Sequence, residues 1–143
     1  MKKYEHWQIA YREGKDEIFK LVSNPSWAWA ADPFLVEYET KIYLFAELYL
    51  YKSERNGVIG CCEYKDGKFG GWSVVMDCHW HLSYPNVWVK NGKLYMCPEM
   101  YQTGEVAVFE LISFPDKWKK IHVFLNNGKY VDSTFMKYQD KNY

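Results

Sequence analysis

A repeat of about 50 residues constrains the fold of this chain more than any other feature of its sequence. The sixteen residues DPFLVEYETKIYLFAE (32–47) align without a gap with YPNVWVKNGKLYMCPE (84–99), which begins 52 positions later. A third copy, DSTFMKYQDKNY (132–143), begins 48 positions after the second. A repeat of this period indicates one supersecondary unit that is stacked several times, because a single unit cannot bury its apolar face alone.

Each unit has the pattern of four β-strands. Its runs of aromatic and β-branched residues are short, and none keeps a helical apolar period over about twelve residues. Turn signals separate the runs: Glu39-Thr40, Asp66-Gly67, Asn91-Gly92 and Asn126-Asn127-Gly128. Four strands per unit are typical of a β-propeller blade. We therefore predict an all-β, partial β-propeller, with N-terminal strands in residues 1–28, blade one in 29–78, blade two in 79–128 and the start of blade three in 129–143.

The repeat also predicts an incomplete ring. Propellers close with roughly four to eight blades, whereas 143 residues supply two whole blades and the first hairpin of a third. Because an open sheet edge invites further pairing, we expect missing C-terminal blades, or other copies in a homo-oligomer, to cover the open edges. A fragment of a longer protein, a short protein that assembles and a remnant of a broken gene all stay open at this point.

Composition argues against several classes of partner. Acidic and basic residues number 18 each and no basic block stands out, so we expect neither a nucleic-acid nor a membrane partner. No apolar region follows the first lysines and no apolar run has transmembrane length, so the expected location is cytoplasmic. No cofactor motif is present. Four cysteines form no C-x-x-C pair and are expected to be free thiols: Cys61, Cys62, Cys78 and Cys97.

Six segments together carry a resemblance to a known family: WAADPF (29–34), YLFAE (43–47), HLSYP (81–85), YMCPE (95–99), FPDKW (114–118) and DSTF (132–135). In this order and spacing the chain resembles the first half of the five-bladed propeller of furanosidase-type glycoside hydrolases, family 43 and its relatives. It resembles especially the subgroup that includes the N-terminal domain of plant glucosamine inositolphosphorylceramide transferase. The resemblance implies about two and a half four-stranded blades of an expected five, and a carbohydrate ligand.

The resemblance also implies roles for carboxyl groups, because glycoside hydrolysis needs two of them across the scissile bond. Carboxylates at the start of the innermost strands share one funnel, and Asp32 and Asp132 hold that position in blades one and three. The family pattern makes Asp32 the general base that activates water. It makes Asp132 the carboxylate that orients the general acid and tunes its pKa. Tyr84 stands at this position in blade two, so the candidate acid is Glu99, at the end of a second strand, or a residue outside this chain.

Five further residues are candidates for sugar binding near the funnel mouth: Trp29, Glu47, His81, Ser83 and Tyr84. The candidate residues also have structural alternatives. Asp32 and Asp132 can make local turns, and His81 and Ser83 can tie down a loop. Glu47 and Glu99 recur in register and suit a repeated bond between blades, and tryptophans pack between blades. Cys78, His79 and His81 lack a fourth ligand, so no metal is expected.

Two functions therefore stay open. One is a carbohydrate-active, glycoside hydrolase-like propeller that acts on or binds glycans. The alternative is a non-catalytic sugar- or glycan-binding propeller attached to a biosynthetic transferase. The missing acid favours the alternative, whereas the segment Ala31-Asp32-Pro33-Phe34 favours the hydrolase.

Overall fold

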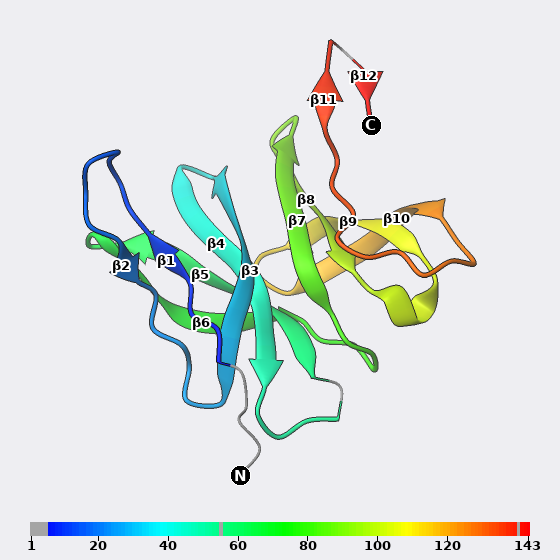
Figure 1. Cartoon of the computed structure of the whole chain (residues 1–143). Helices are drawn as coiled ribbons and strands as arrows, with labels where there is room; N and C mark the ends of the chain where they lie inside the picture. The colour runs from blue at the N-terminus through cyan, green and yellow to red at the C-terminus, as the bar shows by residue number, and fades with distance from the viewer. Residues whose placement is uncertain (1–5, 55, 140) are drawn as a thin grey trace.

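The computed structural model describes residues 6–54, 56–139 and 141–143. Its main elements are two four-stranded antiparallel sheets that follow each other along the chain (Figure 1). In both sheets the strands lie side by side in chain order. The first sheet consists of β3 (Ala28–Tyr38), β4 (Lys41–Leu50), β5 (Gly57–Lys65) and β6 (Lys68–Met76). The second consists of β7 (Ser83–Lys90), β8 (Lys93–Glu99), β9 (Val106–Ser113) and β10 (Lys117–Leu125).

Two short hairpins flank these sheets. Near the N-terminus β1 (Ala10–Tyr11) pairs with β2 (Lys20–Leu21), and near the C-terminus β11 (Lys137–Tyr138) pairs with β12 (Lys141–Asn142). A 3-10 turn (Tyr101–Thr103) lies between β8 and β9, and the described residues contain no α-helix. No helix in the described part of the chain is long and apolar enough to cross a membrane. The prediction of an all-β chain is therefore confirmed.

The hairpins close at the turn signals of the sequence. Asn91 and Gly92 join β7 to β8 with φ values of 52° and 73°. This left-handed pair matches the twist of antiparallel strands and favours Asn-Gly. Glu39 and Thr40 join β3 to β4 with the same left-handed backbone, φ 48° and 65°. The first sheet therefore makes the same turn with two residues that disfavour it.

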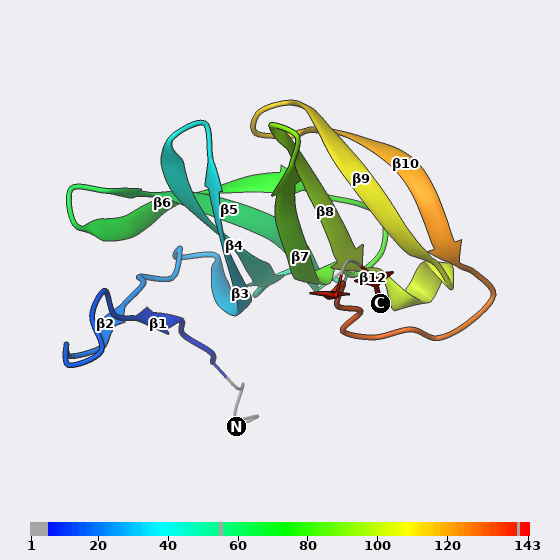
Figure 2. The ribbon, with the colours of Figure 1, turned by 90° about the horizontal axis from the view of Figure 1, so that it is seen from above.

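The main core lies between the two sheets. Figure 2 shows the sheets next to each other, with β3 and β7, their first strands, at the centre. Phe45 and Ile59 of the first sheet pack in one cluster with Leu94 and Met96 of the second, and all four are completely buried. Burying a side chain of this size contributes about 1.5–3 kcal/mol. Because successive side chains of a strand point to opposite faces, Phe45 of β4 joins this core while its neighbour Leu44 belongs to a second cluster.

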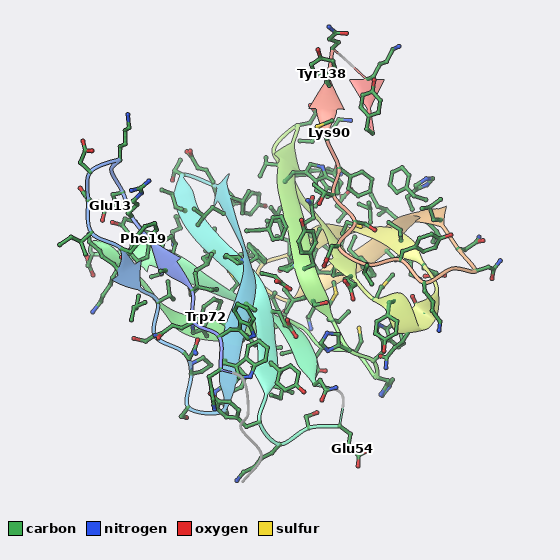
Figure 3. The ribbon with its side chains drawn as sticks, in the orientation of Figure 1. Glu13, Phe19, Glu54, Trp72, Lys90 and Tyr138 are labelled. Atoms are coloured by element: carbon green, nitrogen blue, oxygen red, sulfur yellow. The ribbon has the colours of Figure 1, made fainter. Side chains whose placement is uncertain are left out.

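The N-terminal segment covers the other face of the first sheet. Ile9 and Val22 are buried there against Leu44 and Leu48. The indole N–H of Trp72, on β6, donates a 2.9 Å hydrogen bond to the carbonyl of Ser23 and ties the segment down (Figure 3). The sequence predicted N-terminal strands within residues 1–28. Residues 1–5 lie outside the described part, and the described segment contains the two-residue strands β1 and β2 before β3 begins.

The far face of the second sheet contacts the start of the third repeat. Trp88 packs on Phe135, with ring centroids 5.4 Å apart, and Phe135 packs on Phe124 at 4.9 Å. Phe124 itself is 53% exposed. Residues 129–136 therefore cover only part of this face, and the β11–β12 hairpin extends beyond it (Figure 1).

None of the four cysteines forms a disulfide, as predicted. Cys61, Cys62 and Cys97 are buried, and burial raises the pKa of the thiols of Cys62 and Cys97 to about 12. Protonated buried thiols act as small apolar side chains in the core.

Candidate functional site

A bulge at the start of the inner strand recurs in both sheets. Pairing between β3 and β4 shifts between Ala31 and Phe34, so that Asp32 and Pro33 lie opposite Ala46 alone. Pairing between β7 and β8 shifts in the same way between residues 83 and 86. The residues of the second bulge are Tyr84 and Pro85. Proline suits this place because a bulge residue has no ladder hydrogen bond to donate.

The first residue of each repeat copy has a left-handed backbone. The φ values are 51° for Asp32, 42° for Tyr84 and 49° for Asp132. Glycine is the usual residue in such bulges, and a larger residue there stores strain of order 1–3 kcal/mol. Bulges re-aim side chains. The repeat in the sequence therefore corresponds to a repeated, strained backbone that presents residue 32, 84 or 132.

The bulges bring carboxyl groups to the starts of the inner strands. Glu47 pairs with Ala31 beside the first bulge, and Glu99 pairs with Ser83 beside the second. Glu99 Oε2 accepts a 3.0 Å hydrogen bond from the backbone N–H of Asp132. The carboxylate of Asp32 likewise accepts a hydrogen bond from the backbone of Tyr84. In both cases a carboxylate of one sheet binds the backbone at the start of the next repeat copy: Asp32 binds Tyr84, and Glu99 binds Asp132.

Four carboxyl groups lie close enough to affect one another: Asp32, Glu47, Glu99 and Asp132. The pKa of Asp32 is raised, mainly by burial. The hydrogen bond from the Tyr84 backbone lowers this pKa, the charge of Asp132 raises it, and His81 lowers it. Burial, and then the charges of Asp32 and Glu99, raise the pKa of Glu47 to about 8. Burial also raises the pKa of Glu99. No lysine or arginine among the described residues offsets these shifts.

An imidazole faces this cluster. His81 Nδ1 accepts a 3.0 Å hydrogen bond from the backbone N–H of Gly57, and His81 Nε2 lies 3.5 Å from Glu47 Oε1. Gly57 has no room for a side chain: a Cβ there would lie 2.4 Å from the carbonyl oxygen of Leu82 and 2.8 Å from Glu47 Oε1. Gly57, His81 and Glu47 therefore form one close-packed group from the first sheet and the segment before β7.

A pocket of about 460 Å³ opens at Asp32 and Glu47. The N-terminal segment forms its other wall, and the lining residues that carry large or charged side chains are Trp7, Trp29, Asp32 and Glu47. The ring of Trp29 stacks on Tyr49, with centroids 4.6 Å apart and planes inclined by 4°, and Trp7 is 58% exposed. A second pocket, of about 390 Å³, lies between β6 and the second sheet near Asp116 and Trp118, away from the carboxyl cluster.

The structure brings several of the predicted site residues together and gives others structural contacts. Asp32, Glu47, Glu99, Asp132 and His81 form the cluster, and Trp29 lines the adjoining pocket. Ser83 is buried and pairs with Glu99 in the β7–β8 ladder. The ring of Tyr84 packs edge-on against Phe34, and its hydroxyl lies 2.8 Å from Thr134 Oγ1. Ser83 and Tyr84 thus have structural contacts, and whether either binds sugar stays a prediction.

Sequence reasoning missed two residues of the site. Trp7 has no counterpart in the repeat, so nothing in the sequence pointed to it. Gly57 did carry a signal, because a glycine at a strand start indicates close approach of another group. Among the described residues no three histidine, cysteine, aspartate or glutamate side chains are grouped so that they could hold a metal ion.

Comparison with solved structures concerns the fold. The structure of an α-L-arabinofuranosidase from Lactobacillus brevis superposes with a TM-score of 0.65 at 15% sequence identity. The match covers 85% of this chain and 46% of that one. The fold therefore resembles part of a glycosidase propeller.

Comparison with characterised sequences concerns the family. Glucosamine inositolphosphorylceramide transferase 1 of Arabidopsis thaliana is 36% identical over 114 residues, which are 76% of this chain and 14% of the relative. The protein of the same name from Oryza sativa subsp. indica is 30% identical over 113 residues, 77% of this chain and 15% of its own length. The chain thus spans about one seventh of these relatives. The family model described as "Glucosamine inositolphosphorylceramide transferase 1, N-terminal" matches residues 19–143, and the chain belongs to that family.

Proposed function

We propose that this chain is a sugar-binding propeller module that works beside the catalytic part of a glycan-building transferase. The observation that carries the proposal is the pocket that two acidic residues, Asp32 and Glu47, line together with Trp7 and Trp29. Further support comes from the family, since the plant relatives are named as transferases that act with glucosamine and an inositol lipid.

The pocket has the chemistry of a sugar site. Carboxylate oxygens accept hydrogen bonds from sugar hydroxyls, and charge-assisted bonds of this kind are the stronger ones. Indole rings offer flat apolar faces, and their N–H groups find a polar partner at the wet end. Small-ligand pockets commonly combine such apolar walls with a few convergent polar groups. In this proposal Asp32 and Glu47 bind hydroxyl groups and Trp29 or Trp7 covers the face of a sugar ring.

Glycoside hydrolysis is a second candidate function, and one observation favours it. Hydrolysis requires one carboxylate and one carboxyl group that still carries its proton. Glu47, with a pKa of about 8, lies in the same pocket as Asp32. Two observations count against this candidate. Glu99 already accepts a hydrogen bond from the backbone N–H of Asp132. In the second sheet, the position equivalent to Asp32 holds Tyr84, which has no carboxyl group. Asp32 as base, Asp132 as the tuning carboxylate and Glu99 as acid therefore stay a prediction for this second candidate.

Binding of uncharged sugars by the full chain tests the first proposal. A suitable panel is L-arabinose, N-acetyl-D-glucosamine and myo-inositol, followed by NMR chemical-shift perturbation. We expect at least one of them to shift the indole signals of Trp7 and Trp29, and Asp32→Asn to weaken that binding at least tenfold. Glu63→Gln is the matched control, because Glu63 is a surface partner of Lys41 outside the pocket. Absence of binding by the whole panel, or equal binding by wild type and Asp32→Asn, would contradict the proposal.

Aryl glycosides separate the two functions. A hydrolase releases the aryl alcohol with wild-type protein and loses that activity in Asp32→Asn. A binding module releases none with either protein while it still binds the sugar panel.

A further inference from the structure

We propose that Glu47 acts in this pocket as a neutral carboxylic acid that donates a hydrogen bond to the ligand, while Asp32 accepts one. The inference deepens the proposed sugar site and rests on it for the identity of the ligand. The state of Glu47 itself can be measured without any ligand.

The first argument is the surroundings of Glu47. The residue is 6% exposed and lies on β4 with strand neighbours on both sides, Ala31 of β3 and Ile59 of β5. Asp32 approaches its carboxyl group from β3 and Glu99 from β8. Neither neighbouring strand residue is titratable. Among the described residues, the titratable groups that face Glu47 are therefore two carboxyl groups and the imidazole of His81, and a third carboxyl group, that of Asp132, acts on Glu99 behind them.

The second argument is that His81 is prevented from becoming a counter-ion. An imidazolium carries hydrogen on both nitrogens, but Nδ1 of His81 already accepts the N–H of Gly57 at 3.0 Å. Protonation of Nδ1 would break that bond and place two donors against each other. Gly57 is packed too tightly to give way. The Gly57 hydrogen bond therefore favours the neutral imidazole with its hydrogen on Nε2, which faces Glu47 Oε1 at 3.5 Å.

These two arguments fix the protonation of Glu47. A buried carboxylate without a nearby cation is costly, and such a group takes up a proton instead. Because Nε2–H of His81 faces Oε1, the proton belongs on Oε2, the other oxygen. The raised pKa of Glu47, about 8 and caused mainly by burial, agrees with this assignment.

A proton on Oε2 changes what the pocket can bind. A sugar hydroxyl both donates and accepts a hydrogen bond. Asp32 satisfies the donor function of that hydroxyl, and the acid form of Glu47 satisfies its acceptor function. Ionisation of Glu47 removes the donor and adds a second negative charge beside Asp32. Ligand affinity should therefore fall as the pH rises through the pKa of Glu47.

Carboxyl-detected ¹³C NMR on the full chain without ligand tests the protonation directly, with Glu47→Gln to assign the signal. We expect the side-chain carboxyl carbon of Glu47 to titrate near pH 8. A Glu47 signal that titrates below pH 5.5 would overturn the proposal, whatever the sugars do.

The ligand test uses the same three sugars, which are uncharged from pH 6.5 to 9.5, so that any pH dependence belongs to the protein. Wild type is expected to lose at least tenfold in affinity over this range. Glu47→Gln keeps a donor that cannot ionise and should hold its affinity within twofold. An equal loss in wild type and Glu47→Gln would overturn the donor role. If no sugar binds at any pH, the sugar site fails, and with it the ligand role of Glu47, while the carboxyl titration still decides its protonation.

Discussion

Asp32 and Tyr84 occupy the same position in consecutive sheets, with the same left-handed backbone, and the backbone of Tyr84 donates a hydrogen bond to the carboxylate of Asp32. The relationship joins a strained bulge in one sheet to the equivalent bulge in the next. Strained backbone of this kind persists only where its surroundings over-determine it, and it clusters at functional sites. Here it sets the positions of the residues that line the candidate pocket.

The strain in the turn between β3 and β4 can be tested by giving it the residues of the equivalent turn between β7 and β8. Glu39 and Thr40 adopt left-handed φ values of 48° and 65°, and the equivalent Asn91 and Gly92 adopt 52° and 73°. Left-handed backbone strains a β-branched residue but not glycine. The double substitution Glu39→Asn and Thr40→Gly should therefore raise the free energy of unfolding by about 1–2 kcal/mol. Urea denaturation measures the change. An unchanged or lower midpoint would show that the turn is not strained.

Predictability from the sequence was greatest within a repeat unit. The gapless alignment of residues 32–47 with 84–99 places Asp32 and Glu47 at corresponding points of one hairpin. A two-residue turn at 39–40 fixes the pairing from Tyr38 with Lys41 back to Phe34 with Phe45. Local turn chemistry and the period of two suffice for this step. The bulge at Asp32 and Pro33 then shifts the register by one residue, so that Ala31 pairs with Glu47, and the turn does not predict that shift.

Contacts between units could not be predicted in the same way. The approach of His81 to Glu47 and Gly57 joins segments from different sheets and depends on how the sheets pack, which no local pattern encodes. Trp7 lines the pocket, but it belongs to the N-terminal segment, which has no counterpart in the repeat. The sequence therefore identified all four carboxyl groups of the cluster but not which of them is the most deeply buried.

The close approach at Gly57 predicts that this position tolerates no side chain. In Gly57→Ala the new Cβ meets the carbonyl of Leu82 at 2.4 Å and His81 Cε1 at 2.7 Å. The backbone of β5 must shift, which should lower the free energy of unfolding by about 1–3 kcal/mol. Gly70→Ala is the matched control, because nothing lies within 4 Å of a Cβ at Gly70. Thermal unfolding of both variants measures the difference, and equal melting temperatures would contradict the prediction.

Phe135 is predicted to hold the third repeat copy against the second sheet. Its ring contacts both Trp88 and Phe124. Because the side chain is only half-buried, Phe135→Ala should lower the free energy of unfolding by about 1–2 kcal/mol. Truncation of a fully buried phenylalanine lowers it by more. Amide hydrogen exchange should become faster at Asp132, whose N–H is held by Glu99. Met136→Ala is the control, since Met136 is 57% exposed. Unchanged exchange at Asp132 in Phe135→Ala would show that Phe135 is not the anchor.

Glu47 should make the stability of the fold depend on pH in an unusual direction. Its pKa is about 8 in the folded chain and near 4.5 when unfolded, so between these values the folded state holds one proton more than the unfolded state. Stability must then fall as the pH rises from about 4.5 to 8, by at most about 5 kcal/mol. Glu47→Gln removes this dependence because the amide does not ionise. Chemical denaturation of both proteins at pH 5, 7 and 9 measures the free energy of unfolding. The value for Glu47→Gln relative to wild type should increase at each step. A constant difference between the two proteins would mean that Glu47 is ionised in the folded chain at neutral pH.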